Sequence, residues 1–136
     1  MTDQELFEEF ESTMLDAAQF DHRTHIRCGW IYLTKFGLLE GMSRFSSALK
    51  AFAKAKGAPN RYHETITLAF LLIINERIAR ENNAEDFERF ASANPDLFDW
   101  KNSVLRTYYR EETLKSMFAR KNFVFPDRVG EFRDEG

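Results

Sequence analysis

The sequence PNRYHETITLAFLLIINERI, residues 59–78, predicts a helix that is apolar on almost every side. Asn60 can cap its start, and His63 and Glu64 fall in its first turn, so a polar beginning leads into an apolar body. A helix of this kind needs other helices around it to cover its surface. We therefore expect an all-α, single-domain bundle of five to six helices, with the segment of about residues 60–80 at its centre.

The segment 22–36 is the clearest amphipathic helix. Asp21 is a suitable N-cap and Gly37 a suitable C-terminal stop. At 100° per residue, one side of this helix gathers both of its histidines with its core residues. That side carries His22, His25, Ile26, Gly29, Trp30, Leu33 and Phe36.

Further helices are expected over residues 4–18, 38–56, 85–93 and 103–120, the last with a kink or break at Arg110. Residues 122–136 begin with the apolar stretch Phe123–Pro126 and continue as a charged segment with one aromatic residue, Phe132, and we expect an extended or partly disordered C-terminal tail. The whole chain, residues 1–136, is then a single helical domain.

The composition limits the function classes. The formal net charge is −3 and the basic residues are scattered among acidic ones, which argues against a nucleic-acid partner. The longest uninterrupted apolar run, residues 68–74, is far shorter than the roughly 20 residues that cross a bilayer, so no membrane association is expected. With an acidic N-terminal segment and one cysteine, Cys28, we expect a cytoplasmic protein without a disulfide or a cysteine-based zinc site.

Topology brings the three histidines of the chain together. Short loops in an up-down bundle make helices 22–36 and 59–78 parallel, so that their N-terminal ends lie at the same end of the bundle. His22 and His25 lie near one of these ends and His63 near the other. The sequence therefore predicts a polar pocket there, in which Tyr62, Thr67, Trp30 and Tyr32 are the ligand-binding candidates.

One interpretation of this pocket is a metal site. His22 and His25, spaced as His-x-x-His, would be two ligands and His63 a third, with Glu64 or water completing the shell of zinc, nickel or iron. A zincin protease is excluded, because Thr67 stands where the second histidine of that motif is required.

A second interpretation is acid–base chemistry or ligand binding without a metal. His25, His63 and Glu64 are then the catalytic candidates, since histidine beside a carboxylate exchanges protons near neutral pH. Two helix N-termini facing one cavity also favour a small polar or anionic molecule. Whether the chain is an enzyme stays open at this point.

The alternative function is a non-catalytic interaction or structural protein, in which the histidines are hydrogen-bonded core residues. Phe123, Phe125 and Phe132 would then dock on the chain itself or on a partner, and a homodimer is one such arrangement.

Two motifs also carry a resemblance. FDHRTHIR at residues 20–27, with Trp30, Tyr32 and Leu33, and YHETIT at residues 62–67 resemble a family of small bacterial all-helical proteins. The resemblance implies a helical fold over about residues 20–126 and brings no known activity to transfer. A more remote likeness is to DinB-type bundles, which place three histidines around a metal. The histidine spacing here differs from theirs.

Overall fold

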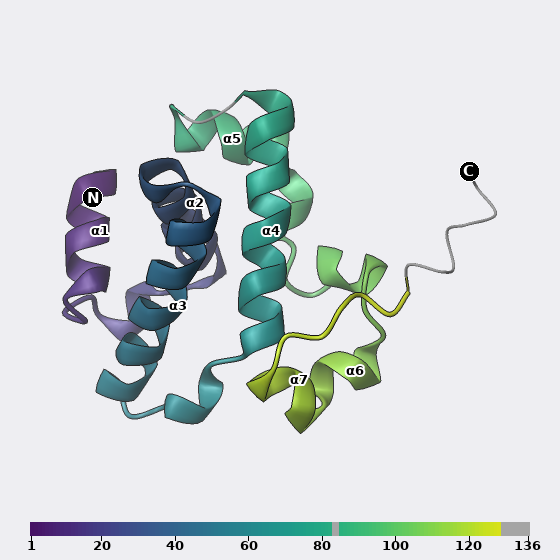
Figure 1. Ribbon diagram of the computed structural model, residues 1–136. Helices are drawn as coiled ribbons and strands as arrows, with labels where there is room; N and C mark the ends of the chain where they lie inside the picture. The colour runs from purple at the N-terminus through teal and green to yellow at the C-terminus, as the bar shows by residue number, and fades with distance from the viewer. Residues whose placement is uncertain (83–84, 129–136) are drawn as a thin grey trace.

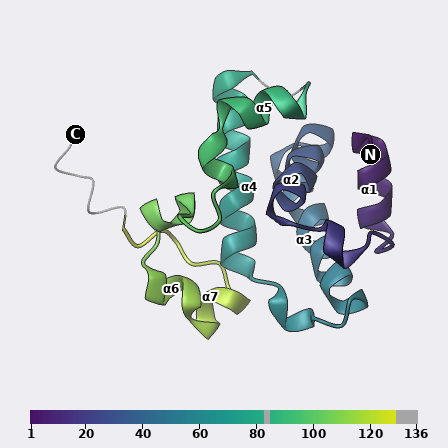
Figure 2. The same cartoon turned by 180° about the vertical axis from the view of Figure 1, so that it is seen from behind.

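Helix α4, Glu64–Glu81, stands in the middle of the molecule (Figure 1). A computed structural model describes residues 1–82 and 85–128, and this part of the chain contains helices, turns and irregular segments but no strand. Helices α1, α2 and α3 lie on one side of α4, and α6 and α7 lie on the other, in the front view and in the view from behind (Figure 2). The predicted all-α bundle with this segment at its centre is confirmed, and the described residues form seven α-helices where five to six were expected.

The remaining elements are short or amphipathic. The other α-helices are α1 Asp3–Glu11, α2 His22–Phe36, α3 Leu38–Ala55, α5 Phe87–Ala93, α6 Glu111–Lys115 and α7 Met117–Lys121. Single 3₁₀ turns lie at Ala17–Gln19, Pro59–Arg61, Pro95–Phe98 and Val104–Thr107. None of the helices described has the length and apolar content that are needed to span a bilayer.

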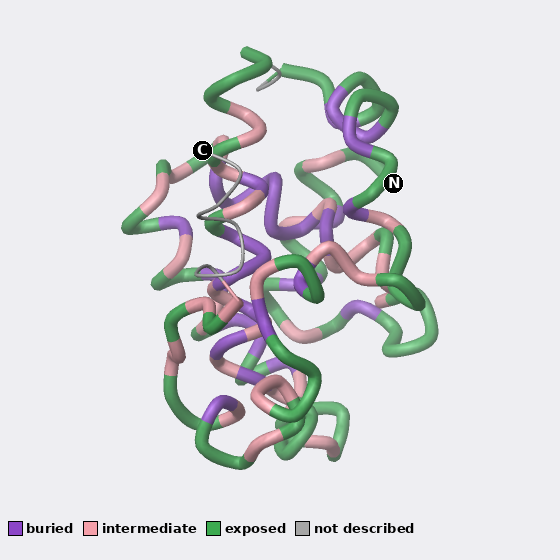
Figure 3. Tube along the Cα trace, turned by 90° about the vertical axis from the view of Figure 1, so that its right-hand side faces the viewer, coloured by how far each residue is buried: buried purple, intermediate pink, exposed green. Residues whose placement is uncertain are grey.

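Helix α2 has the bounds that its sequence predicts and is buried along much of its length. Asp21 caps it by accepting the N–H of Thr24 at 2.8 Å, and Gly37 ends it with φ 81°. Seven of its residues are buried: Ile26, Cys28, Gly29, Trp30, Ile31, Tyr32 and Leu33. Figure 3 shows buried stretches toward the inside of the molecule and exposed ones on outer helical turns as well as in the connections.

The core between α1, α2 and α3 is aromatic. Phe10 has no exposed surface, and its ring lies 5.2 Å from Phe20, 5.6 Å from Phe45 and 5.4 Å from Phe52, between centroids. A glycine makes the approach of α3 to α2 possible, because a Cβ on Gly41 would lie 2.9 Å from the backbone oxygen of Tyr32.

The first helix is shorter than the sequence predicts. α1 ends at Glu11 rather than at residue 18, since Thr13 takes a left-handed backbone with φ 63°. A separate 3₁₀ turn then starts at Asp16, whose carboxylate accepts the N–H of Ala18 at 3.0 Å. The periodic apolar residues of this segment do not indicate where such a left-handed residue ends the helix.

The central helix also begins later than predicted. Pro59 opens a separate 3₁₀ turn, and Tyr62 is extended with ψ 136°, so α4 starts at Glu64. The N-cap residue is His63 and not Asn60. The helix ends at Asn82, in a left-handed conformation, as predicted; Asn83 lies outside the described residues.

The break predicted at Arg110 within the helix over residues 103–120 is confirmed, but the continuous helices expected on either side of it are wrong. The segment forms a 3₁₀ turn followed by α6 and α7, and the backbone is extended at Arg110 and again at Ser116. The N–H of Arg110 donates to Asp127 at 2.8 Å, and Ser116 caps α7 by accepting the N–H of Ala119 at 3.1 Å. Polar side chains at these two breaks replace the helical hydrogen bonds.

Residues 122–128 contain no helix and cross the start of α4. The Thr65 hydroxyl donates to the carbonyl of Asn122 at 2.7 Å and accepts the N–H of Val124 at 3.1 Å. Phe123 contacts Phe125, which keeps 81% of its surface exposed. Phe132, for which a docking role was predicted, lies outside the described residues.

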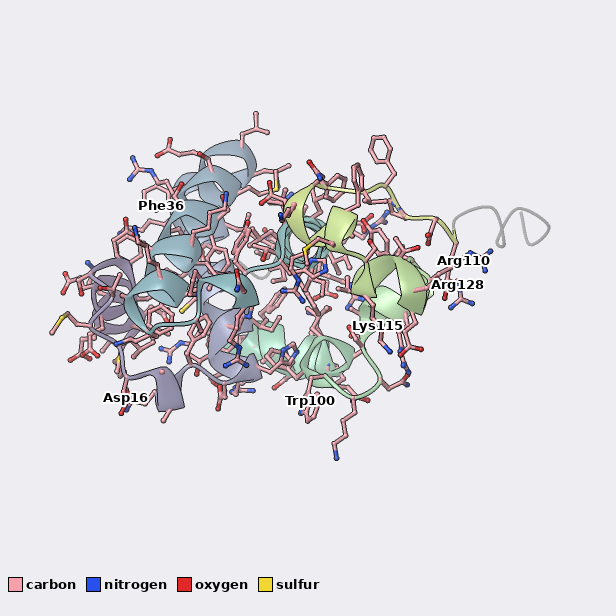
Figure 4. All side chains as sticks on the ribbon, turned by 90° about the horizontal axis from the view of Figure 1, so that it is seen from below. Asp16, Phe36, Trp100, Arg110, Lys115 and Arg128 are labelled. Carbon is pink, nitrogen blue, oxygen red and sulfur yellow. The ribbon has the colours of Figure 1, made fainter. Side chains whose placement is uncertain are left out.

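The view from below shows the two sides of the molecule, each marked by labelled residues (Figure 4). Asp16 and Phe36 mark the side of α1 to α3, whereas Arg110, Lys115 and Arg128 mark the side of α6 and the chain that follows α7. The candidate site lies between these two sides, where the C-terminal end of α3, the turn Pro59–Arg61, the start of α4 and α7 meet.

Candidate functional site

A pocket of about 370 Å³ opens at the end of the bundle that receives the N-termini of α2 and α4. We call it the histidine pocket, because His22, His25 and His63 all line it. Its walls are largely apolar, and its volume lies within the range of small-molecule sites. The apolar and aromatic side chains that line it are Ala17, Phe20, Leu49, Phe52, Ala53, Ala58 and Ile66. Tyr62 and Thr67, both predicted from the sequence, line it as well.

His63 has a structural position in this pocket. Its Nδ1 accepts the N–H of Ile66 at 3.1 Å, which caps α4, and its Nε2 donates to the carbonyl of Leu114 at 2.7 Å. Burial lowers the pKa of the ring, in keeping with the neutral form that this pair of hydrogen bonds requires. Both ring nitrogens are therefore engaged, and neither is available to a metal or to a substrate proton.

His22 and His25 differ in their hydrogen bonding. His22 donates from Nε2 to the carbonyl of Leu97 at 2.9 Å and lies edge-on to Phe70. The His25 ring stacks on Phe20 and Phe45, at 5.2 and 5.7 Å between centroids. Within the described part of the chain, no hydrogen-bond partner of the His25 nitrogens is found.

The pKa of His25 is lowered to about 4, first because burial disfavours the charged ring and second because His22 is nearby. At neutral pH the ring is therefore uncharged. A neutral imidazole has one N–H donor and one acceptor nitrogen. His25 thus offers hydrogen-bonding capacity in a mainly apolar pocket without adding charge to it.

Three cationic side chains line the same pocket: Lys56, Arg61 and Arg120. The Nη1 of Arg120 donates to the carbonyl of Asn60 at 2.8 Å and lies 3.4 Å from that of Tyr62, which fixes the guanidinium. Among residues 1–82 and 85–128, none of the three cations forms an ion pair with a carboxylate.

The carboxylate that lines the pocket is Asp21. It caps α2, and the hydrogen bonds from Thr24 lower its pKa. The Asp21 oxygen that accepts the Thr24 N–H is therefore already engaged. The pocket as a whole has an excess of positive charge beside an apolar wall.

Three sequence-predicted residues lie elsewhere. Glu64 accepts the hydroxyl hydrogen of Tyr62 at 2.6 Å and lines a neighbouring cavity. Trp30 packs against Phe87, and Tyr32 is fully buried and donates to Glu11. Trp30 and Tyr32 share a helix with His22, but they follow it by eight and ten residues, which is about 12 and 15 Å along the axis.

The histidines do not form the metal centre that the His-x-x-His spacing suggested. In the part of the chain described here, no group of three or more His, Cys, Asp or Glu side chains is arranged to hold a metal ion. The physical reason is local, since His63 uses both nitrogens and His22 uses one in hydrogen bonds to the backbone. The residues present therefore do not fit zinc, nickel or iron.

Sequence reasoning missed Lys56 and Arg120. Lys56 follows α3 directly, where a basic residue is explained by the helix dipole, so nothing marked it as part of a site. Arg120 is supplied by α7, which packs on α4 only in the folded chain. Arg61 directly precedes Tyr62 and lies two residues before His63, so its place near the pocket could have been inferred from the sequence.

No family model, no curated protein and no solved structure matches this chain. The resemblance to small bacterial helical proteins therefore stays a prediction, and function has to be argued from the pocket itself.

Proposed function

We propose that this protein binds a small organic anion in the histidine pocket. The observation that carries the proposal is the set of three cations, Lys56, Arg61 and Arg120, that line one pocket without a carboxylate partner in the described chain. Like charges held close together repel, and a bound anion relieves that repulsion. Arginine is also well suited to bind carboxylate or phosphate oxygens with two parallel hydrogen bonds.

The walls favour a ligand with an apolar or aromatic body. Phe20 and Phe52 line the pocket, and their rings lie 5.0 Å apart between centroids. An aromatic ligand gains area burial and ring contacts against such a wall. His25 supplies an uncharged hydrogen-bonding group beside it, so the ligand combines an anionic group, an apolar body and a polar atom within reach of His25.

The side chains support binding of the anion without a chemical reaction. The Tyr62 hydroxyl has a raised pKa, first through burial and then through its hydrogen bond to Glu64, so it stays protonated. Burial raises the pKa of the Cys28 thiol to about 12. We further propose a cytoplasmic location, in keeping with this buried, unpaired thiol.

Isothermal titration with naphthoate tests the proposal, with naphthylmethylamine as the cation of the same ring. We expect naphthoate to bind and the amine not to bind. Arg61→Gln and Lys56→Gln should each weaken naphthoate binding by roughly tenfold or more, because each removes a charge-assisted contact. Lys54→Gln is the matched control, since Lys54 is an exposed residue of α3 that does not line the pocket.

Two outcomes contradict anion binding. One is equal binding of the carboxylate and the amine. The other is a loss of affinity in Lys54→Gln as large as that in Arg61→Gln, which would mean that only the net charge of the surface matters.

A second candidate function is self-association through the C-terminal segment. It is favoured by the exposed apolar side chains of Met117, Phe118 and Phe125, since such side chains mark interfaces when they lie together. A homodimer in solution that dissociates on replacement of Phe118 and Phe125 by serine would support it, and a monomer at high concentration would exclude it.

A further inference from the structure

A second cavity, of about 540 Å³, lies next to the histidine pocket. Tyr62 and Arg120 line both, so these two side chains form the boundary between them. Six further residues line the second cavity but not the histidine pocket: Lys50, Lys121, Pro59, Asn60, Met117 and Glu64. The two cavities are thus neighbouring compartments at one end of the bundle.

The second cavity is also rich in positive charge. The Lys50 ammonium lies 5.0 Å from the centre of the Tyr62 ring, and no ion pair is found for Lys50 or Lys121 in the described residues. Glu64, the carboxylate of this cavity, accepts the Tyr62 hydroxyl hydrogen. Positively charged side chains therefore line both cavities, and Arg120 lies between them.

Arg120 is held so that it can serve both compartments. Its Nη1 is fixed by the carbonyls of Asn60 and Tyr62, and its other nitrogens have no protein hydrogen bond in the described chain. A guanidinium carries five N–H donors in a fixed plane, so most of them remain for a ligand.

We infer that the ligand is an aromatic phosphate ester, with its ring in the histidine pocket and its phosphate at Arg120, facing Lys50 and Lys121. A phosphate has three free oxygens and a charge near −2, so it accepts hydrogen bonds from several sides at once. A carboxylate has two oxygens in one plane and satisfies fewer of these donors. This inference rests on the proposed function and deepens it.

Titration with naphthyl phosphate, naphthoate and inorganic phosphate, at neutral pH and constant ionic strength, tests the inference. We expect naphthyl phosphate to bind at least about tenfold more tightly than naphthoate, and inorganic phosphate to bind more weakly than either. The double variant Lys50→Gln/Lys121→Gln should weaken naphthyl phosphate by about tenfold and naphthoate by less than about twofold.

The control is again Lys54→Gln, which removes one lysine charge from α3 outside both cavities. Equal affinities for the two naphthyl anions, or an equal loss for both in the double variant, would overturn the phosphate assignment and leave the anion pocket standing. If neither naphthyl compound binds, the proposed function fails together with the inference.

Discussion

Replacing Phe10 by alanine is expected to lower the free energy of unfolding by about 3–5 kcal/mol. The Phe10 ring is completely buried and contacts Phe20, Phe45 and Phe52. Alanine leaves a cavity among these rings that they cannot fill without leaving their own contacts. Small domains have a total stability of only about 5–15 kcal/mol, so this single change should remove a large part of it.

Urea unfolding followed by circular dichroism measures this loss. Phe125→Ala is the matched control, since it removes the same atoms from a side chain that is 81% exposed, and we expect a change of about 0.5 kcal/mol or less. Phe20 and Phe52 also line the histidine pocket, so a loosened core should weaken naphthoate binding too. Similar destabilisation by both variants would mean that Phe10 is not the centre of the core.

We expect the free energy of unfolding to fall by about 3 kcal/mol between pH 6.5 and about 4 because of the titration of His25. Its pKa is lower in the folded chain than in the unfolded one, so the unfolded chain takes up the proton first. The stabilising effect of the neutral ring is thus fully present above pH 6.5 and is lost by about pH 4.

The comparison of wild type with His25→Phe isolates this effect, since phenylalanine keeps a ring between Phe20 and Phe45 but does not titrate. Urea unfolding of both proteins across the acidic range gives the two pH profiles. Carboxylates with lowered pKa values, such as Asp21 and Asp96, contribute equally to both. Wild type should therefore lose more stability between pH 6.5 and 4 than the variant, and parallel profiles would contradict the neutral state of His25.

The sequence predicted the fold best where capping residues and periodicity agree. Asp21 and Gly37 bound α2 as expected, and the apolar run of residues 68–74 lies within the central helix. It predicted least where polar side chains bond to distant backbone. The break at Arg110 was predicted, but not the Asp127 carboxylate that accepts its N–H, because these two residues are seventeen apart and meet only in the folded chain.

The candidate site was also predictable where it depends on the order of helices, and not where it depends on packing between distant segments. Parallel placement of α2 and α4 was sufficient to bring His22, His25 and His63 to one pocket. The helical wheel predicts the direction of a side chain but not its position along the helix axis, so it also placed Trp30 on the side of the histidines. The cation from α7, Arg120, depends on packing between elements far apart in the chain, and no local pattern announces it.

Anion binding in the histidine pocket can be observed directly at the imidazole signals of the protein. The chain has three histidines, so their ring resonances can be assigned by single replacement. On titration with naphthoate we expect a saturable shift of the His25 resonances, which disappears in the double variant Lys56→Gln/Arg61→Gln and persists in Lys54→Gln. Naphthoate that leaves His25 unchanged, or that shifts it equally in the double variant, would contradict the proposed site.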